Sequence, residues 1–322
     1  MKQINIGLLG LGNIGTGTYK VLETNRREIE EAAGASVQIT KILEKDIDRP
    51  RDIDVPRERF VSDAEDIFSD PDIHIVIELL GGVEPAATLM ERALCSGKHV
   101  VTANKAALAA NFDRLMKAAK DHGVTLRFEA SVGGGIPVLT PLTSCLRANK
   151  FTRILGIVNG TTNYILDKMT LEGLPYEEVL KDAQEKGFAE ADPTADVEGI
   201  DAANKLSILM ALMFNHYVHP DDIPTKGITD ITKEDIEAAK KDGNLIKLIA
   251  YAEVMEDGEI KYEVRPMRII ETHPLGGVHR EYNAVFVEGN VVGNLMFYGP
   301  GAGPLPTGSA VMGDVIEIVK AM

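Results

Sequence analysis

Cysteine is scarce in this sequence of 322 residues, in which Cys95 and Cys145 are the two present. Two cysteines support neither a disulfide framework nor a metal cluster, so a reducing cellular interior is the simplest setting. No apolar run reaches the roughly 18 residues of a membrane-spanning helix. The N-terminus also lacks the charged region, apolar stretch and cleavage site of a signal peptide. We therefore expect a soluble cytoplasmic protein.

Positive charge is the minority sign. The sequence has 34 Lys and Arg against 49 Asp and Glu, which gives a formal net charge of -15. Such a balance argues against a nucleic-acid partner and against an anionic membrane surface, because both ligands attract basic surfaces. It leaves a phosphate-bearing small molecule possible, since backbone amides bind phosphate locally.

The order of apolar segments predicts two domains. Up to Arg147, short apolar runs alternate with helix-like segments, which is typical of a doubly wound parallel sheet. Four later runs between residues 247 and 298 are separated by turns and predict a mainly antiparallel sheet. The predicted fold is therefore α/β, with a Rossmann-type domain of residues 1–150 and 304–322, to which the last helix returns, and an α+β domain of residues 151–303.

The first apolar run leads directly into a glycine-rich turn. Residues Ile4 to Leu9 predict a buried strand, Gly10-Leu11-Gly12-Asn13-Ile14-Gly15 matches G-x-G-x-x-G, and a helix is expected from Ile14 to Ala33. In that context the glycines permit a tight turn, a close pyrophosphate and a closely packed helix whose first amides face the phosphates. The sequence thus predicts a dinucleotide site.

Two further segments follow predicted strands of this domain. Glu44-Lys45-Asp46 ends the second strand, where a carboxylate would bind the ribose of NAD and a cation the 2′-phosphate of NADP, so the coenzyme stays undecided. Ala103-Asn104-Lys105 follows the strand ending at Thr102, and ligands bind at such carboxyl ends. Topology therefore makes Lys105 a candidate, although an ordinary surface lysine is the usual outcome.

A turn near residue 130 has the composition of a hard-cation site. We expect a strand over Val124 to Ala130, and Glu129 near its end precedes the glycine-rich run Ser131 to Pro137. A carboxylate beside exposed backbone carbonyls is the ligand set that such cations prefer. A glycine-rich turn without any ion fits the residues equally well.

The stretch from Gly187 to Leu212 carries the main candidate for proton transfer. Asp192-Pro193 predicts the start of a helix, and four residues separate Asp201 from Lys205 within it, so the two share one helix face. Most such pairs are surface ion pairs. Here apolar residues flank the pair on both sides, which favours burial, and a polar pair buried there must be satisfied or used. With Glu190, Asp192 and Asp196 upstream, Lys205 is a candidate proton donor in an acidic pocket.

With these motifs in view, the chain resembles the homoserine dehydrogenases. The matching segments occur in the family's order and cover nearly the whole chain: GLLGLGNIGTGT, TANKAALA, EASVGGGIP, GIVNGTTNYIL, GFAEADPTADVEGIDAANKL and YGPGAGPLPTGSAVMGD. The resemblance implies NAD(P)-dependent interconversion of L-homoserine and L-aspartate 4-semialdehyde, in the aspartate-derived pathway to threonine, methionine and isoleucine. It also implies a homodimer or homotetramer, formed through the sheet of the second, catalytic domain.

The resemblance implies a role for each site residue. Lys205 and Lys105 would be catalytic, and Glu190, Asp196, Asp201 and Lys105 would bind the amino-acid substrate. A sodium ion would be held by Glu129 with backbone atoms of Val132, Gly134 and Ile136, as a structural tie between the domains. NADP or NAD would be bound by a set of ten residues: Gly10, Gly12, Asn13, Ile14, Gly15, Lys45, Thr102, Asn104, Lys105 and Gly303.

The chain departs from the family's pattern in two places. Glu44 precedes Lys45 where many members have a basic residue for the NADP phosphate, and no regulatory ACT domain follows Met322, so threonine inhibition through one is not expected. Two other functions fit parts of the sequence. A thiol-dependent aldehyde dehydrogenase needs a reactive cysteine, but Cys145 is expected to be packed and Cys95 to lie inside a helix. A non-catalytic NAD(P) sensor would not need Lys205 among carboxylates.

Overall fold

The computed structural model describes residues 2–322 and divides into two compact units. The first unit contains the chain up to Gly135 together with Ala302–Met322, and the second is Ile136–Gly301. The division lies earlier than the expected boundary at residue 150, because helix α7 (Leu139–Thr143) packs against α11 (Ile200–Met213) of the second unit. None of the described helices combines the length and apolar character that a membrane crossing requires.

The first unit is built on a parallel sheet of six strands in the order β3-β2-β1-β4-β5-β6. The strands are β1 (Lys2–Leu9), β2 (Ala35–Leu43), β3 (Phe60–Val61), β4 (Ile73–Glu78), β5 (His99–Thr102) and β6 (Leu126–Arg127). Strand order reverses beside β1, which pairs in parallel with both β2 and β4. In open α/β sheets, ligands bind outside the carboxyl ends of the strands at such a reversal.

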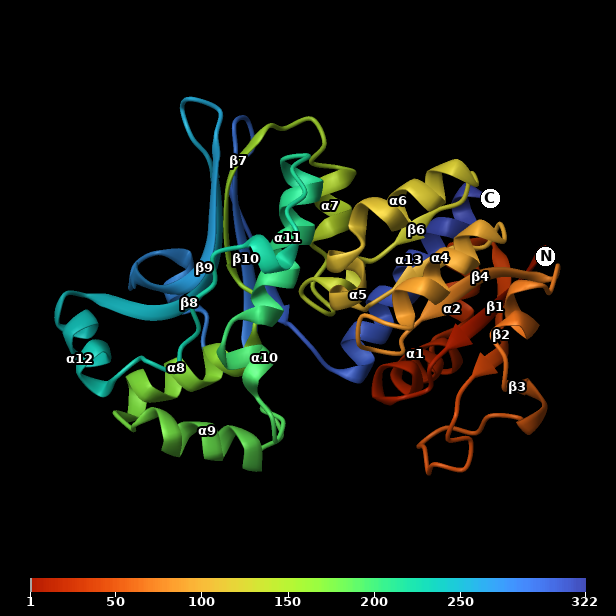
Figure 1. Cartoon of the computed structure of the whole chain (residues 1–322), viewed down its shortest axis with the longest axis horizontal. Coiled ribbons are helices and arrows are strands. Elements are labelled where there is room, and N and C mark those ends of the chain that lie inside the picture. The colour runs from red at the N-terminus through yellow and green to blue at the C-terminus, as the bar shows by residue number, and fades with distance from the viewer. Residues whose placement is uncertain (1) are drawn as a thin grey trace. The chain divides into compact units, whose positions relative to one another are not determined.

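The helices of the first unit include the last one of the chain. They are α1 (Asn13–Thr24), α2 (Arg26–Ala33), α3 (Glu65–Phe68), α4 (Ala86–Cys95), α5 (Lys105–Ala110), α6 (Phe112–Asp121) and α13 (Pro304–Ala321). As predicted, the last helix returns to the first unit, where the blue α13 packs against the red α1 (Figure 1). Gly17 permits the close approach, since a Cβ there would lie 2.3 Å from the carbonyl oxygen of Pro304.

Several local expectations for the first unit are wrong. The helix expected over 14–33 is interrupted at Asn25, whose φ of -112° and ψ of 28° are not helical. The strand expected over 124–130 ends at Arg127, because the chain then turns into the short 3-10 helix Glu129–Ser131. Cys95 is the last residue of α4 instead of lying inside that helix, and it is exposed. Cys145, which belongs to the second unit, is exposed where the sequence predicts a packed residue.

The second unit contains the predicted antiparallel sheet. Its strand order is β11-β10-β7-β8-β9, and every neighbouring pair is antiparallel. The strands are β7 (Phe151–Ile157), β8 (Asn244–Val254), β9 (Ile260–Ile270), β10 (Tyr282–Gly289) and β11 (Gly293–Pro300). Besides α7 and α11, its helices are α8 (Gly160–Glu172), α9 (Tyr176–Glu185), α10 (Thr194–Val197) and α12 (Lys233–Lys241).

The helix expected to run from Pro193 through Lys205 is two helices. Gly199 separates α10 from α11 with φ of 83°, a left-handed conformation that glycine adopts without steric cost. Asp192 accepts hydrogen bonds from the backbone N–H and hydroxyl of Thr194, so the expected carboxylate cap is present, but on the short α10. The break allows α11 to start in a new direction, and this helix carries Asp201 and Lys205.

Replacing Gly199 by alanine is expected to lower the free energy of unfolding by about 1–3 kcal/mol. The φ angle strains any L-residue, and the new Cβ would also lie 3.0 Å from Cγ2 of Thr225. Gly243→Ala is a matched control, because its φ is 69° but no described atom lies within 4 Å of the added Cβ. Urea unfolding measures both variants, and equal losses would contradict the idea that packing at Gly199 is tight.

Candidate active site

The site in the second unit is centred on a buried ion pair in the first turns of α11. Lys205 is 7% exposed and Asp201 6% exposed, and Nζ of Lys205 lies 2.7 Å from Oδ2 of Asp201. Nζ also donates to the backbone carbonyl of Val158 at 2.5 Å, just beyond the end of β7. The carboxylate and the carbonyl compensate for loss of water around the ammonium, which would otherwise be costly to bury.

Asn159 connects this pair to a second carboxylate. Its Nδ2 donates to Oδ2 of Asp201 at 2.9 Å and to Oδ1 of Asp196 at 2.7 Å. Its Oδ1 accepts from the backbone N–H of Thr162 at 2.8 Å and so caps α8. Thr161 donates its hydroxyl to the other oxygen of Asp196 at 3.1 Å. Two carboxylates are thus held beside one ammonium.

The sequence prediction did not include Asn159. The available signal was its position directly after a predicted strand and before Gly160-Thr161-Thr162, which is the pattern of a helix cap at the carboxyl end of a strand. Of the acidic residues that were predicted, the structure places Asp196 and Asp201 together through Asn159. Glu190 is exposed on the segment before α10, and its backbone carbonyl accepts from Nε2 of Gln184.

The first turn of α8 is also suited to bind an anion. The first amides of a helix have no partner within the helix and carry partial positive charge. In α8 the cap by Asn159 uses the amide of Thr162, which leaves those of Gly160 and Thr161 outside that cap. A small amino acid carries one carboxylate and one ammonium, so amides beside a pair of carboxylates match both of its charges.

In the first unit, the glycine-rich turn has the shape that a pyrophosphate needs. Gly10 has φ of 92°, and a Cβ on Gly15 would lie 2.2 Å from the carbonyl oxygen of Gly10, so both positions require glycine. Around Gly12 no described atom lies within 4 Å of an added Cβ, so the backbone is open to a ligand. No side chain caps the start of α1 at Gly12, which leaves its first amides available.

Glu44, at the end of β2, is already engaged by the protein. Its carboxylate accepts from the amide of Leu11 at 2.8 Å and from the amides of Lys45 and Asp46, and Arg51 lies 3.3 Å away. Burial alone would raise the pKa of Glu44, but these amides and the Arg51 guanidinium outweigh it and hold the pKa below its ordinary value. Glu44 therefore fixes the glycine-rich turn in position.

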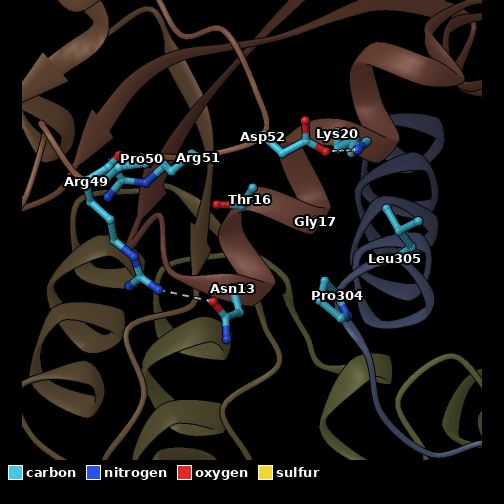
Figure 2. A pocket seen from close by; sticks show the side chains of 10 residues that line it. All are labelled: Asn13, Thr16, Gly17, Lys20, Arg49, Pro50, Arg51, Asp52, Pro304 and Leu305. Atoms are coloured by element: carbon cyan, nitrogen blue, oxygen red, sulfur yellow. Dashed lines mark hydrogen bonds and ion pairs between the residues drawn. The ribbon is translucent and has the colours of Figure 1, made fainter. Parts of the chain in front are cut away.

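A cavity of about 300 Å³ lies beside α1 (Figure 2). It is lined by Asn13, Thr16, Gly17, Lys20, Arg49, Pro50, Arg51, Asp52, Pro304 and Leu305. Arg49 extends over the start of α1 and donates to Oδ1 of Asn13 at 3.3 Å, whereas Lys20 pairs with Asp52 (Figure 2). Arg51 also donates Nε to the carbonyl of Leu11 at 2.8 Å, so two guanidinium groups lie at the glycine-rich turn, with Lys45 exposed on the same loop.

The other predicted residues of the first unit lie on two turns. Asn104 caps α5 by accepting from the amide of Ala107 at 3.1 Å, and the half-buried Lys105 is the first residue of that helix. Thr102 is buried at the end of β5. At the amino end of α13, Gly303 occupies the cap position with φ of 123°, which a residue with a side chain rarely adopts.

The turn that contains Glu129 is buried and tightly bent. Glu129 is 8% exposed, and Gly133 and Gly134 follow with φ angles of 77° and 57°. The amide of Glu129 donates to Oδ2 of Asp314 at 2.8 Å, and burial raises the pKa of Asp314 to about 7. Among the described residues no group of three or more His, Cys, Asp or Glu side chains could hold a metal ion. A cation at this turn would therefore depend on Glu129 and backbone carbonyls.

Models of known protein families match segments in each of the two units. The family model for the NAD binding domain of homoserine dehydrogenase matches residues 10–129, and the model for homoserine dehydrogenase matches residues 137–316. Homoserine dehydrogenase from Bacillus subtilis (strain 168) is 47% identical across 100% of this chain and 74% of its own length. The homoserine dehydrogenase from Synechocystis sp. PCC 6803 is 46% identical across 98% of this chain and 73% of its own.

Solved structures show the same fold. The homoserine dehydrogenase of Thiobacillus denitrificans superimposes with a TM-score of 0.96 at 42% identity, over 99% of this chain and 74% of that one. The Staphylococcus aureus homoserine dehydrogenase at pH 6.5 gives 0.86 at 40% identity, over 99% and 76%. A hyperthermophilic archaeal homoserine dehydrogenase in complex with NADPH gives 0.83 at 24% identity, which shows a shared fold.

The dinucleotide turn and the buried lysine site define an NAD(P)-dependent oxidoreductase. Within that class, the chain belongs to the homoserine dehydrogenase family.

Proposed function

We propose that Lys205 is the general acid and base in the interconversion of L-homoserine and L-aspartate 4-semialdehyde. The nicotinamide coenzyme, when bound, supplies or accepts the hydride at the substrate carbon. In reduction, Nζ of Lys205 gives a proton to the aldehyde oxygen as that oxygen becomes a hydroxyl. In oxidation, a neutral Nζ takes the hydroxyl proton. The observation that supports this proposal most directly is the buried ion pair, in which Nζ of Lys205 lies 2.7 Å from Oδ2 of Asp201.

Asp201 supports this role in two ways. Its carboxylate favours the ammonium form of Lys205, whereas burial of the pair opposes that form. Asp201 and the carbonyl of Val158 also fix the direction of Nζ. Directed proton transfer requires a donor that is held in one orientation within hydrogen-bond reach.

The charges of the substrate suggest roles for the remaining predicted residues. We assign the substrate ammonium to the acidic group of Glu190, Asp196 and Asp201, because a charge-assisted hydrogen bond to a carboxylate is among the stronger polar contacts. Lys105 would balance either the substrate carboxylate or a coenzyme phosphate. We further propose that the enzyme acts in the cytoplasm, in the aspartate-derived route to threonine, methionine and isoleucine.

The first unit would bind NAD or NADP through the glycine-rich turn and the turns around it. Gly10, Gly12, Asn13, Ile14 and Gly15 would contact the pyrophosphate, for which the open backbone at Gly12 is the supporting observation. The further contacts would come from a second set of residues: Lys45, Thr102, Asn104, Lys105 and Gly303. We therefore assign nucleotide binding to the first unit and catalysis to the second.

A sodium ion is proposed at the turn of Glu129, with backbone atoms of Val132, Gly134 and Ile136 as its other ligands. The proposal is supported by a buried carboxylate that two glycines with left-handed φ angles follow in a sharp bend, because hard cations prefer carboxylate and backbone carbonyl oxygens. Asp314 holds the amide of Glu129 from α13, so the bend has a fixed position within the first unit.

The sheet of the second unit has a face that suits self-association, and we propose a homodimer or homotetramer formed through it. Leu155 pairs with Tyr251 on one neighbouring strand and with Phe286 on the other, and Phe286 pairs in turn with Met296. Residues paired across neighbouring strands project to the same face of a sheet, so these four side chains share one face. Met296 is 39% exposed and Tyr298, two residues along, 50% exposed. A half-exposed apolar sheet face is the kind of surface that a partner covers.

Lys205→Ala is expected to lower kcat by roughly 10²–10⁴-fold while leaving the dissociation constant of NADPH within about twofold. The wild-type oxidation rate should rise with pH, because Lys205 must start that reaction neutral, whereas reduction should tolerate neutral pH. Initial rates in both directions with NADPH and NADH, and NADPH fluorescence titration, measure these effects. A normal kcat in Lys205→Ala, or fastest oxidation near pH 6, would remove Lys205 from the chemistry.

Glu129→Ala should abolish any dependence of the melting temperature on sodium. The wild-type protein is expected to melt at a higher temperature in sodium chloride than in choline chloride at equal ionic strength, because an ion that binds the native state stabilises it. Choline is too large for a carbonyl-lined turn and so controls for screening. The same melting temperature in both salts for the wild type would argue against a sodium site.

Met296→Glu should weaken the oligomer, because it places a charge on the apolar face of the sheet. Light scattering coupled to size-exclusion chromatography is expected to show a lower mass than for the wild type. Val291→Glu is the matched control, since Val291 is 80% exposed in the turn before β11 and lies outside the paired face. An unchanged mass for Met296→Glu would place the interface elsewhere.

A further inference from the structure

Glu78 is a buried carboxylate that the proposed mechanism does not use. It is the last residue of β4 and is 0% exposed. Its position is the carboxyl end of the sheet in the first unit, on the strand that pairs with β1 where strand order reverses. An acidic side chain is rarely buried completely unless its oxygens have partners.

The partners of Glu78 come from two different turns. Its Oε2 accepts the hydroxyl hydrogen bond of Thr102 at 2.7 Å, at the end of β5. Its Oε1 accepts from the amide of Leu80 at 2.7 Å and, more weakly, from Nδ2 of Asn104 at 3.4 Å. Burial raises the pKa of Glu78, and the hydrogen bonds from Thr102, Leu80, Asn104 and Gly81 oppose this effect in part.

On one side, this network determines where α5 begins. The hydroxyl oxygen of Thr102 accepts from the backbone amide of Asn104 at 2.9 Å while its hydrogen is donated to Glu78. Asn104 in turn donates Nδ2 to the carbonyl of Gly82 at 2.8 Å and caps α5 through Oδ1. Lys105 is the next residue, so its backbone position depends on the chain of contacts that starts at Glu78.

On the other side, the network reaches the glycine-rich turn. The amide of Leu79 donates to the carbonyl of Leu9 at 2.8 Å, and a Cβ on Gly10 would lie 2.8 Å from the carbonyl oxygen of Leu79. Gly81 and Gly82 have φ angles of 82° and 69°, so the turn after β4 has little intrinsic stiffness. The carboxylate of Glu78 supplies the restraint that these glycines lack.

We propose that Glu78 is a positioning residue for coenzyme binding, because it fixes Leu80–Gly82 and Thr102–Lys105 to each other beside the glycine-rich turn. This proposal rests on the proposed coenzyme contacts of Thr102, Asn104 and Lys105. A coenzyme that contacts both the glycine-rich turn and the turn of Thr102–Lys105 is bound well only if the separation of these turns is set before it arrives. No charge on the coenzyme would meet Glu78 itself, since the carboxylate is fully covered.

The test measures coenzyme affinity directly by titrating the fluorescence of bound NADPH, which requires no turnover. Glu78→Gln keeps the size of the side chain and removes one acceptor, whereas Thr102→Val removes the hydroxyl that connects Glu78 to Asn104. Each variant is expected to raise the dissociation constant of NADPH about tenfold or more. The dissociation constant of the double variant should be about that of the single variant that binds NADPH less tightly, because both changes break the same link.

Lys98→Met is the matched structural control. Lys98 is also buried, at 7% exposed, and its Nζ donates to the carbonyls of Asp70 and Ile73 at the opposite, amino end of the same sheet. This variant should lower the melting temperature without changing the dissociation constant of NADPH by more than about twofold. In steady-state assays, Glu78→Gln should raise KM for the coenzyme.

An NADPH dissociation constant within twofold of the wild type in Glu78→Gln, with a melting temperature lowered as in Lys98→Met, would overturn the proposal and make Glu78 a purely structural acid. Fully additive losses in the double variant would also overturn it. If Glu78→Gln does not fold, Glu78→Asp decides by the same affinity threshold, because it keeps the carboxylate but shortens its reach to Thr102. Thr102→Val alone does not decide, since Thr102 is itself a proposed coenzyme contact. The result is independent of Lys205, because a failure of the proposed proton transfer would leave these binding constants readable.

Discussion

The second unit depends on one electrostatic requirement: an ammonium that is buried must be paired with acceptors that replace its water. Lys205 meets this requirement with the carboxylate of Asp201 and the carbonyl of Val158. Because an uncompensated buried charge costs several kcal/mol, the end of β7 and the start of α11 cannot separate without exposing or stranding it. Asn159 donates hydrogen bonds to both Asp201 and Asp196, so it connects a second carboxylate to the pair, and it also caps α8. The polar groups suited to chemistry are therefore the ones that hold these elements together.

The first unit uses carboxylates in a comparable way. Glu44 directly follows β2 and Glu78 ends β4 of one parallel sheet, and each accepts backbone amides from the turn after its strand. Each also reaches a second turn, Glu44 the glycine-rich turn through Leu11 and Glu78 the turn of Thr102. Turns rich in glycine are flexible by themselves. A half-buried carboxylate, Glu44, and a buried one, Glu78, thus supply at the strand ends the order that a dinucleotide site requires.

Much of this arrangement was predictable from local sequence patterns. Apolar runs ending in glycine predicted the strands and the dinucleotide turn, and the apolar flanks of Asp201 and Lys205 predicted that the pair is buried, as it is. Some errors occur where one residue changes the backbone direction, at Asn25 and Gly199. Others occur where packing decides whether a side chain is buried. Cys145 was expected to be packed because it follows a helix-like run, but the turn after α7 leaves it exposed.

The sequence by itself determined the family, the alternation of strands and helices and the residue types of the site, because these depend on periodicity and on motifs of short range. Only the tertiary structure decided which polar groups share a hydrogen bond. Asn159 lies 42 positions from Asp201, and Glu129 lies 185 positions from Asp314, yet both pairs are in contact. The division at Gly135 likewise follows from packing of α7 on α11. Such partners are selected by burial and by the need to satisfy every buried polar group, and both conditions exist only in the folded chain.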